Sequence, residues 1–288
     1  MLITLTAPAF AGTWYIENGD ITVKASGTEG KNTVSQGNKK DVEDTNTIIT
    51  NREDKASSNT VTIDAGSDKV EVTLKDVNID TSSRNKAAVS VTGSGNTTIK
   101  LDGDNHLTGG NGIYSNSIGS LTISGGTVKA AGGDGSDGGS GISSSSGVTV
   151  SDGTVTANGG NSTGSYGSGG DGIRSDGGVT ISGGTVTAAG GDSKDGYGGD
   201  GIRSGGGVTI SGNTVNAAGG NGGNVGGYGI CSFDRVAISG GTVEAAGGDS
   251  KDGYGRRHLQ QRHRSVRQPR ADRQGRQSQR QGPLAERQ

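Results

Sequence analysis

The chain has 288 residues, of which 59 are glycine, 27% are hydrophobic and only 3% are aromatic, and its formal net charge is −2. So few apolar residues are typical of disordered chains, but a near-zero charge and apolar residues that recur periodically favour a folded protein. With one cysteine, Cys231, the fold has no internal disulfide, and the charge does not suggest a nucleic-acid-binding protein.

The first eleven residues, Met1–Ala11, resemble the end of a secretory signal peptide. Ala9, Phe10 and Ala11 fit the small-x-small cleavage rule, and an apolar stretch precedes them. We interpret residues 1–11 as the remnant of such a signal, which indicates an extracellular or cell-surface protein. No stretch approaches the ~20 apolar residues of a membrane span, so we expect none.

Residues 12–111 contain short runs in which apolar and small polar residues alternate, as in strands of irregular β-helix coils. Lys31–Ser58 is the most polar segment, and we expect a solvated excursion there. Trp14 is the only tryptophan, and we place it in a cap over the open end of the core, because terminal coils must cover it. The expected strands are Thr13–Glu17, Ile21–Ala25, Thr47–Thr50, Thr60–Asp64, Val70–Leu74, Ala88–Val91 and Thr98–Leu101.

Residues 112–255 repeat one pattern, GI-x-S, then [VL]-T-[IV]-S, then T-V-x-A and a Gly/Asp/Ser loop. The copies begin at Gly112, Gly141, Gly172, Gly201 and Gly229. Self-similarity at this period indicates a solenoid, and Gly-Gly pairs supply the positive φ angles of tight corners. We therefore predict an all-β fold, a right-handed parallel β-helix with Gly-rich coils of about 29 residues.

Stacked coils place equivalent residues above one another, so the inward ladders can be read from the repeat. We expect a narrow core of isoleucine, valine and alanine. The ladders are Ile113, Ile142, Ile173, Ile202, Ile230; Ile123, Val150, Ile181, Ile210, Ile238; Val128, Val155, Val186, Val215, Val243; and Ala130, Ala157, Ala188, Ala217, Ala245.

The last segment, residues 256–288, is rich in arginine and glutamine. A basic tail of this kind can bind nucleic acid or an anionic surface. Glycine and serine codons read one base out of frame give arginine and glutamine codons, and another GI-x-S coil is due at this point. We therefore interpret residues 256–288 as a disordered tail produced by a frameshift, with no nucleic-acid partner.

No Ser/His/Asp or Cys/His set can be assembled, since histidine is almost absent. Polysaccharide lyases on this fold suggest another arrangement, in which carboxylates bind calcium and an arginine acts as base. Arg174 and Arg203, beside Asp171 and Asp200, would stack on adjacent coils. Because both pairs belong to duplicated DGIRS segments, we favour an outward ion-pair ladder and predict no catalysis.

Calcium is the one cofactor that the sequence suggests. Residues 132–137 match the start of a calcium-binding nonapeptide, which includes Asp134 and Asp137, but no tandem copies follow. Each coil also has a Gly-Gly-Asp/Asn corner. Its side-chain oxygens either ligate a cation or hydrogen-bond the corner backbone. The corner residues are Asp134, Asn161, Asp192, Asn221 and Asp249.

Four tyrosines lie in the Gly-rich loops just before a coil begins: Tyr166, Tyr197, Tyr228 and Tyr254. A file of exposed rings offers flat apolar faces on which sugar rings stack. The alternative is that each ring folds back over its own loop. The sequence leaves both readings open.

VEVTLKDVNID (70–80), AAVSVTGSGNTTIKLDGDNHL (87–107) and the VTISGGTVTAAGG coils resemble secreted bacterial β-helix proteins of the carbohydrate-binding-domain-containing type. Members of that family bind plant-type polysaccharides and calcium. The resemblance implies a non-catalytic, adhesin-like protein that binds a polysaccharide or cell-envelope glycan. The alternatives are a structural stalk of a larger surface protein and a polysaccharide lyase-like enzyme.

Overall fold

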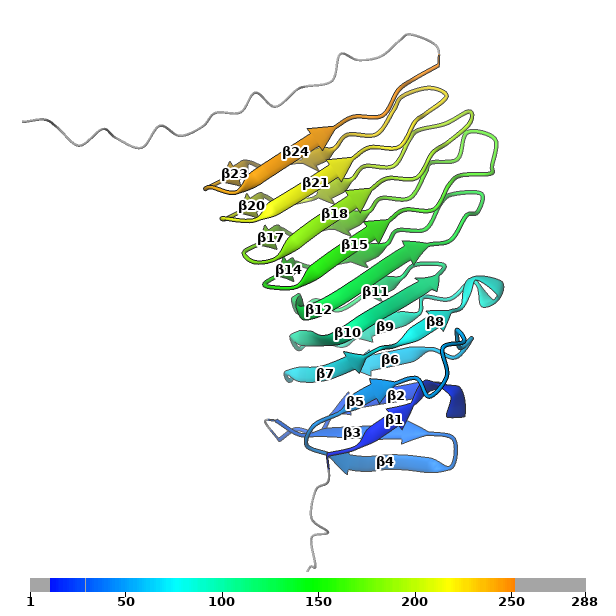
Figure 1. Cartoon of the computed structure of the whole chain (residues 1–288), viewed down its shortest axis with the longest axis vertical. Helices are drawn as coiled ribbons and strands as arrows, with labels where there is room; N and C mark the ends of the chain where they lie inside the picture. The colour runs from blue at the N-terminus through cyan, green and yellow to red at the C-terminus, as the bar shows by residue number, and fades with distance from the viewer. Residues whose placement is uncertain (1–10, 29, 252–288) are drawn as a thin grey trace, which may run out of the picture.

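The protein is a parallel β-solenoid, described by a computed structural model over residues 11–28 and 30–251 (Figure 1). Each coil lies on the one before it, and strands of successive coils pair in parallel. Register partners are 24 to 31 residues apart over most of the solenoid, as in Ile113 with Val89 and Ile142 with Ile173. The predicted parallel β-helix is confirmed, while its right hand stays a prediction.

Each regular coil has three strands, as the repeat predicts. The first strand recurs as β11 (Ile113–Ser115), β13 (Ile142–Ser144), β16 (Ile173–Ser175), β19 (Ile202–Ser204) and β22 (Ile230–Ser232). The other two are continuous in β12 (Leu121–Gly132). They separate afterwards into β14 (Val148–Val150) and β15 (Thr154–Asn158), β17 (Val179–Ile181) and β18 (Thr185–Ala189), β20 (Val208–Ile210) and β21 (Thr214–Ala218), and β23 (Val236–Ile238) and β24 (Thr242–Ala246).

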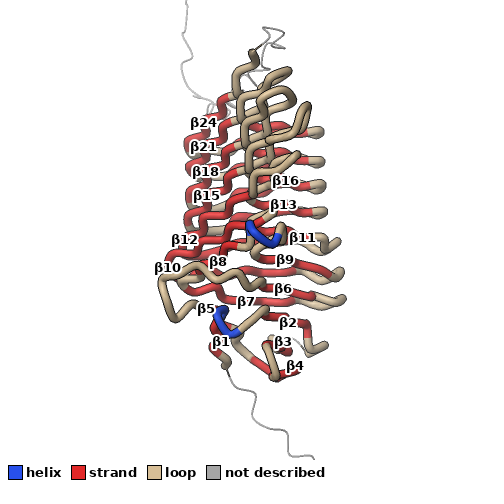
Figure 2. Tube along the Cα trace, turned by 90° about the vertical axis from the view of Figure 1, so that its right-hand side faces the viewer, coloured by secondary structure: helices blue, strands red, loops and turns tan. Residues whose placement is uncertain are grey.

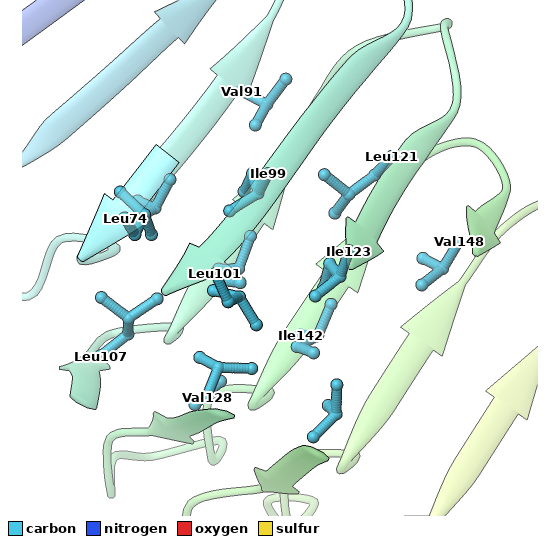
Figure 3. Packing of buried hydrophobic residues seen from close by; sticks show 14 of the residues in the cluster. Leu74, Val91, Ile99, Leu101, Leu107, Leu121, Ile123, Val128, Ile142 and Val148 are labelled. Atoms are coloured by element: carbon cyan, nitrogen blue, oxygen red, sulfur yellow. The ribbon is translucent and has the colours of Figure 1, made fainter. Parts of the chain in front are cut away.

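The predicted ladders form the core (Figure 3), and they pair in register between coils. Two inward ladders were missed. One is apolar and continues the second strand: Leu121, Val148, Val179, Val208 and Val236. The other consists of buried serines whose hydroxyls donate to backbone carbonyls, as Ser175 Oγ does to Ser146 O at 2.6 Å.

Glycine serves two physical purposes in the coil. At the corner between the second and third strands, Gly184 has φ +76°, a conformation that L side chains rarely adopt. In the long loops glycine is needed for close approach instead. A Cβ on Gly170 would overlap the carbonyl oxygen of Gly139 in the coil below. The loops therefore stack backbone on backbone, and side chains emerge only at the few positions without this contact.

The N-terminal coils are irregular but follow the same stacking. Their elements are β1 (Thr13–Tyr15), η1 (Ile16–Asn18), β2 (Ile21–Ala25), β5 (Ile48–Thr50), β6 (Val61–Asp64), β7 (Val70–Lys75), β8 (Asn78–Asp80), η2 (Ser82–Arg84), β9 (Val89–Thr92) and β10 (Thr97–Gly109). Strand β10 is longer than expected because it runs through the corner and pairs with both β7 and β8.

The expectation of a solvated excursion at Lys31–Ser58 is wrong for its first half. Strands β3 (Asn32–Gln36) and β4 (Lys39–Asp44) form an antiparallel hairpin that extends the sheet beyond β2. Trp14 belongs to this cap as expected: it is 5% exposed, and its indole N–H donates to Asp44 Oδ2 at 2.7 Å. Strand β4 is almost fully exposed and charged, which discourages pairing with another chain.

The last described coil, β22 to β24, leaves its ladder residues Ile230, Val236, Ile238 and Val243 only partly buried. The prediction that Ala245 points into the core is wrong, since Ala245 is exposed in this coil. Over the described ranges, no helix is long and apolar enough to cross a membrane. The proposed signal remnant, apart from Ala11, and the proposed tail lie outside the described residues.

Candidate functional site

The long Gly-rich loops form a ridge along one side of the regular coils, where they face the viewer in Figure 2. They join the third strand of one coil to the first strand of the next. Isolated parallel bridges connect them, including Ser162 with Ser193, Ser193 with Gly222, and Gly222 with Ser250. The loops are therefore an ordered extension of the solenoid, and they carry the residues that the sequence singled out.

A shallow cavity of about 300 Å³ opens on these loops, and we call it the loop groove. It crosses four successive coils, so its long direction follows the solenoid axis. Its lining combines one aromatic ring, two ammonium groups, one carboxylate and small polar groups. The lining residues are Ser165, Tyr166, Lys194, Asp195, Gly223, Asn224 and Lys251.

Gly223 creates the gap between the two lysines of the groove. Ser193, Gly222 and Ser250 are joined by parallel bridges from coil to coil. The residues that come directly after them therefore stack on three successive coils: Lys194, Gly223 and Lys251. Because the middle coil has no side chain here, the Lys251 Nζ reaches across to the Lys194 carbonyl oxygen at 3.4 Å. The Lys251 side chain therefore crosses the bare backbone of Gly223, and its ammonium group lies at the Lys194 side of the gap.

Tyr166 is held in a strained conformation at one end of the groove. Its φ is +67°, in the left-handed region, and it is 77% exposed. The turn around it closes with a hydrogen bond from the Gly167 N–H to the Gly164 carbonyl at 3.3 Å. A bulky residue in this region costs about 1 to 2 kcal/mol relative to glycine, and its ring gains no burial in exchange. Such strain is a reason to consider a functional role.

The predicted file of tyrosines is wrong as an arrangement, because the rings occupy different register positions. Tyr197 is 54% exposed and pairs with Val225 rather than with another tyrosine. Tyr228 is half-buried, and its N–H donates to Asp200 Oδ1 at 2.7 Å. It therefore occupies the register position that Asp171 and Asp200 hold in the two coils below. Tyr254 lies outside the described residues. Of the described tyrosines, only Tyr166 lines the loop groove.

Asp171 and Asp200 form a buried carboxylate pair at the start of β16 and β19. They are 8% and 4% exposed, and the Asp200 N–H donates to Asp171 Oδ1 at 2.7 Å. Asn111 makes the equivalent contact two coils earlier, where it accepts from the Ser140 N–H at 2.8 Å. An amide therefore serves this position as well as a carboxylate does, and the negative charges add an electrostatic cost.

Burial raises the pKa of Asp171 to about 6, and the neighbouring charge of Asp200 adds to this effect, although the hydrogen bond from the Asp200 N–H opposes it. Burial also raises the pKa of Asp200, against the opposing N–H of Tyr228 and the guanidinium of Arg203. The half-buried Cys231 lies on the next coil. Its pKa is raised by burial and by the charge of Asp200.

Only one of the two expected ion pairs forms as the sequence suggested. Arg203 Nη1 contacts Asp200 Oδ2 at 3.3 Å, and its guanidinium also lies 5.4 Å from the ring centre of Phe233. Arg174 turns instead to Asp176, at 3.8 Å. The two arginines are in register on the outer face of β16 and β19, as expected.

The corner residues form a hydrogen-bonded ladder from coil to coil. Each side-chain Oδ1 accepts the N–H of the corner residue above it, at 2.6 to 2.9 Å. Asp and Asn alternate, so no carboxylate stacks directly on another. Asp137 lies apart from this ladder and accepts the Ser168 N–H at 2.8 Å. Over the described ranges, no three His, Cys, Asp or Glu side chains gather as a metal site would require, and calcium stays a prediction.

The groove lysines were missed although the sequence carries a signal for them. The hexapeptide SKDGYG occurs at residues 193–198 and again at 250–255, and the coil between them has GGNVGG instead. Two identical loops separated by a glycine-rich one predict paired side chains around a gap. That inference requires the loop register, which the varying coil lengths conceal.

A family model described as a β-helix repeat matches residues 121–146, 179–202 and 236–255. Each stretch begins at the second strand of a coil, β12, β17 or β23, and continues into the Gly-rich loop after the third strand, and together they cover less than half of the chain. Neither the curated proteins nor the solved structures gave a match to the chain. The chain therefore carries repeats similar to those of β-helix proteins, and this similarity concerns the fold.

Proposed function

We propose that the protein is a non-catalytic polysaccharide-binding module of a secreted or cell-surface protein, and that the loop groove binds the polysaccharide. The observation that carries the proposal is Tyr166, an exposed ring kept at a strained backbone position in the groove. Natural chains tolerate such strain mostly at functional sites. An exposed aromatic face with a polar tip suits the stacking of a sugar ring.

The direction of the groove supports a linear polymer as the ligand. The groove crosses the loops of four coils, and adjacent parallel strands lie about 4.8 Å apart. The length of one sugar unit in an extended polysaccharide is similar to this spacing, so successive sugar units can contact successive coils. Ser165 and Asn224 supply a hydroxyl and an amide that can hydrogen-bond sugar hydroxyls.

Tyr166→Gly is expected to change stability and binding in opposite directions. Glycine adopts the left-handed conformation without strain, so the free energy of unfolding should rise by about 1 kcal/mol. Loss of the ring should weaken glycan binding at least tenfold. Thermal unfolding and a glycan array, followed by calorimetry on the best ligand, measure the two effects.

Tyr114→Ala is the matched control, because Tyr114 is an exposed ring on β11, outside the groove. It should leave glycan binding unchanged. Binding that survives Tyr166→Gly, or a parent protein that binds no glycan, contradicts the proposal. In that case the structural stalk becomes the better reading, since a stalk needs only the buried ladders.

We further expect no turnover of polysaccharides. The carboxylate pair is almost fully buried, which leaves little surface for a substrate, and this supports a non-catalytic role. Incubation with pectin, alginate and xylan should give neither new reducing ends nor unsaturated sugars. Turnover that disappears in Arg174→Ala or Arg203→Ala would instead favour the lyase-like alternative.

A further inference from the structure

We infer that the ligand of the loop groove is an anionic polysaccharide whose carboxylates pair with Lys194 and Lys251. This inference rests on the proposed function and adds the chemical class of the ligand. It is carried by the charges that line the groove and by the approach of the Lys251 ammonium group to Lys194 across Gly223. Tyr166 defines where a sugar ring stacks, and the lysines define which sugars are preferred.

The charge of the groove is opposite to that of the surrounding protein. Residues 1–255 carry 17 Lys and Arg against 27 Asp and Glu. Among the described residues, three charged side chains line the groove, Lys194, Lys251 and Asp195, and their formal charges sum to +1. Within this acidic part of the chain, the two lysines favour ligands of negative charge over neutral ones.

The geometry keeps the two ammonium groups available to a ligand. Both lysines are exposed, and neither makes an ion pair with a carboxylate within the described part of the chain. The only hydrogen bond of the Lys251 Nζ there is to the Lys194 backbone carbonyl, at a long 3.4 Å. Because the Lys251 ammonium group lies at the Lys194 backbone, a carboxylate bound there can accept from both lysines, and such charge-assisted hydrogen bonds are stronger than neutral ones.

Asp195 provides an internal control for the charge effect, because its charge is opposite to that of the two lysines. It lines the same cavity, is exposed, and makes no ion pair within the described part of the chain. Its negative charge repels a carboxylated ligand that the lysines attract. Removing this charge therefore raises the affinity for a polyuronate, whereas removing either lysine lowers it.

The test compares polymers that differ only in charge. Oligosaccharides of galacturonan, mannuronan and glucuronan are titrated into the full chain by calorimetry, each beside the same polymer with its carboxyls reduced to hydroxymethyl groups. At least one polyuronate should bind ten times more tightly than its neutral partner. Its affinity should fall several-fold between about 0.05 and about 0.3 M NaCl, because salt screens exposed charges.

The variants separate this inference from the proposed function. Lys194→Gln and Lys251→Gln should each weaken polyuronate binding about tenfold without affecting a neutral sugar, and Asp195→Asn should strengthen it. Neutral glycans that bind as tightly as polyuronates, in a manner that depends on Tyr166, would overturn the inference and leave the proposed function intact. Absence of binding to every polymer would overturn both. Tighter binding of single-stranded DNA than of any polyuronate would overturn the inference.

Discussion

Ile181→Ala is expected to lower the free energy of unfolding by about 2 to 5 kcal/mol, the range for truncating a fully buried isoleucine. Ile181 is completely buried, and it stacks between Val150 below and Ile210 above. The cavity cannot collapse, because strand pairing fixes the backbone on both sides. Urea unfolding followed by circular dichroism measures the loss.

Ile238→Ala is the matched control, since Ile238 occupies the same ladder in the last described coil and is only partly buried. Its truncation should cost less than half as much. Equal losses would contradict the view that each coil is stabilised by its two neighbours. The comparison also shows whether the solenoid unfolds as one unit or frays from this end.

The regular coils could be predicted closely because repetition solves the register problem. Once Ile142, Ile173 and Ile202 occupy equivalent places in their copies, parallel stacking puts them in one ladder, and the structure does so. The ladder that begins with Leu121 and Val148 was readable from the same repeat. The buried serines were not, because their burial depends on carbonyls such as that of Ser146, whose position the sequence does not reveal.

The N-terminal cap could not be predicted from polarity. Its hairpin covers the end of the solenoid, where unpaired carbonyls need donors, so polar side chains belong inside. Gln36 is buried and donates from Nε2 to the Tyr15 carbonyl at 2.7 Å and to the Gly19 carbonyl at 3.0 Å. Asn32 donates to the Glu71 carbonyl at 2.9 Å. What resembled a solvated loop is a polar inner face of the cap.

Only part of the candidate site could be predicted from the sequence, for a different reason. The coils differ in length by one to three residues, and the differences fall in the loops. Tyr166, Tyr197 and Tyr228 look equivalent in sequence, yet these small shifts move them to three different positions. The same loops bring Lys194 and Lys251 together across Gly223, a contact that the repeated SKDGYG hexapeptide indicates only once the loop register is known.

Asp171 and Asp200 show a different limit of sequence reasoning. The repeat predicts that they stack, but only the structure shows that both are buried and that the backbone hydrogen bond of Asp171 is one that Asn111 makes equally well. Charge at this position is therefore dispensable for the hydrogen bond. Its effect on stability depends on pH in a direction that can be tested.

Asp171→Asn is expected to stabilise the protein at neutral pH by about 2 to 3 kcal/mol. Burial raises the pKa of Asp171 to about 6 from an ordinary value of 3.8, so between these values the folded protein binds more protons than the unfolded chain. The protonated carboxyl contributes full stability below about pH 4, and this contribution is lost as the pH rises through 6. Asparagine keeps the acceptor oxygen without the charge.

Urea unfolding of the parent and of Asp171→Asn between pH 4 and pH 8 measures this effect. The difference between them should be small near pH 4, grow up to about pH 6, and stay constant above it. Asp192→Asn is the control, because Asp192 is exposed and accepts the Asn221 N–H at 2.6 Å in the corner ladder. That variant should change stability little at any pH. If Asp171→Asn instead destabilises the protein at pH 7.5, the Asp171 carboxylate is held by favourable contacts with Arg174 and Arg203 that outweigh its burial.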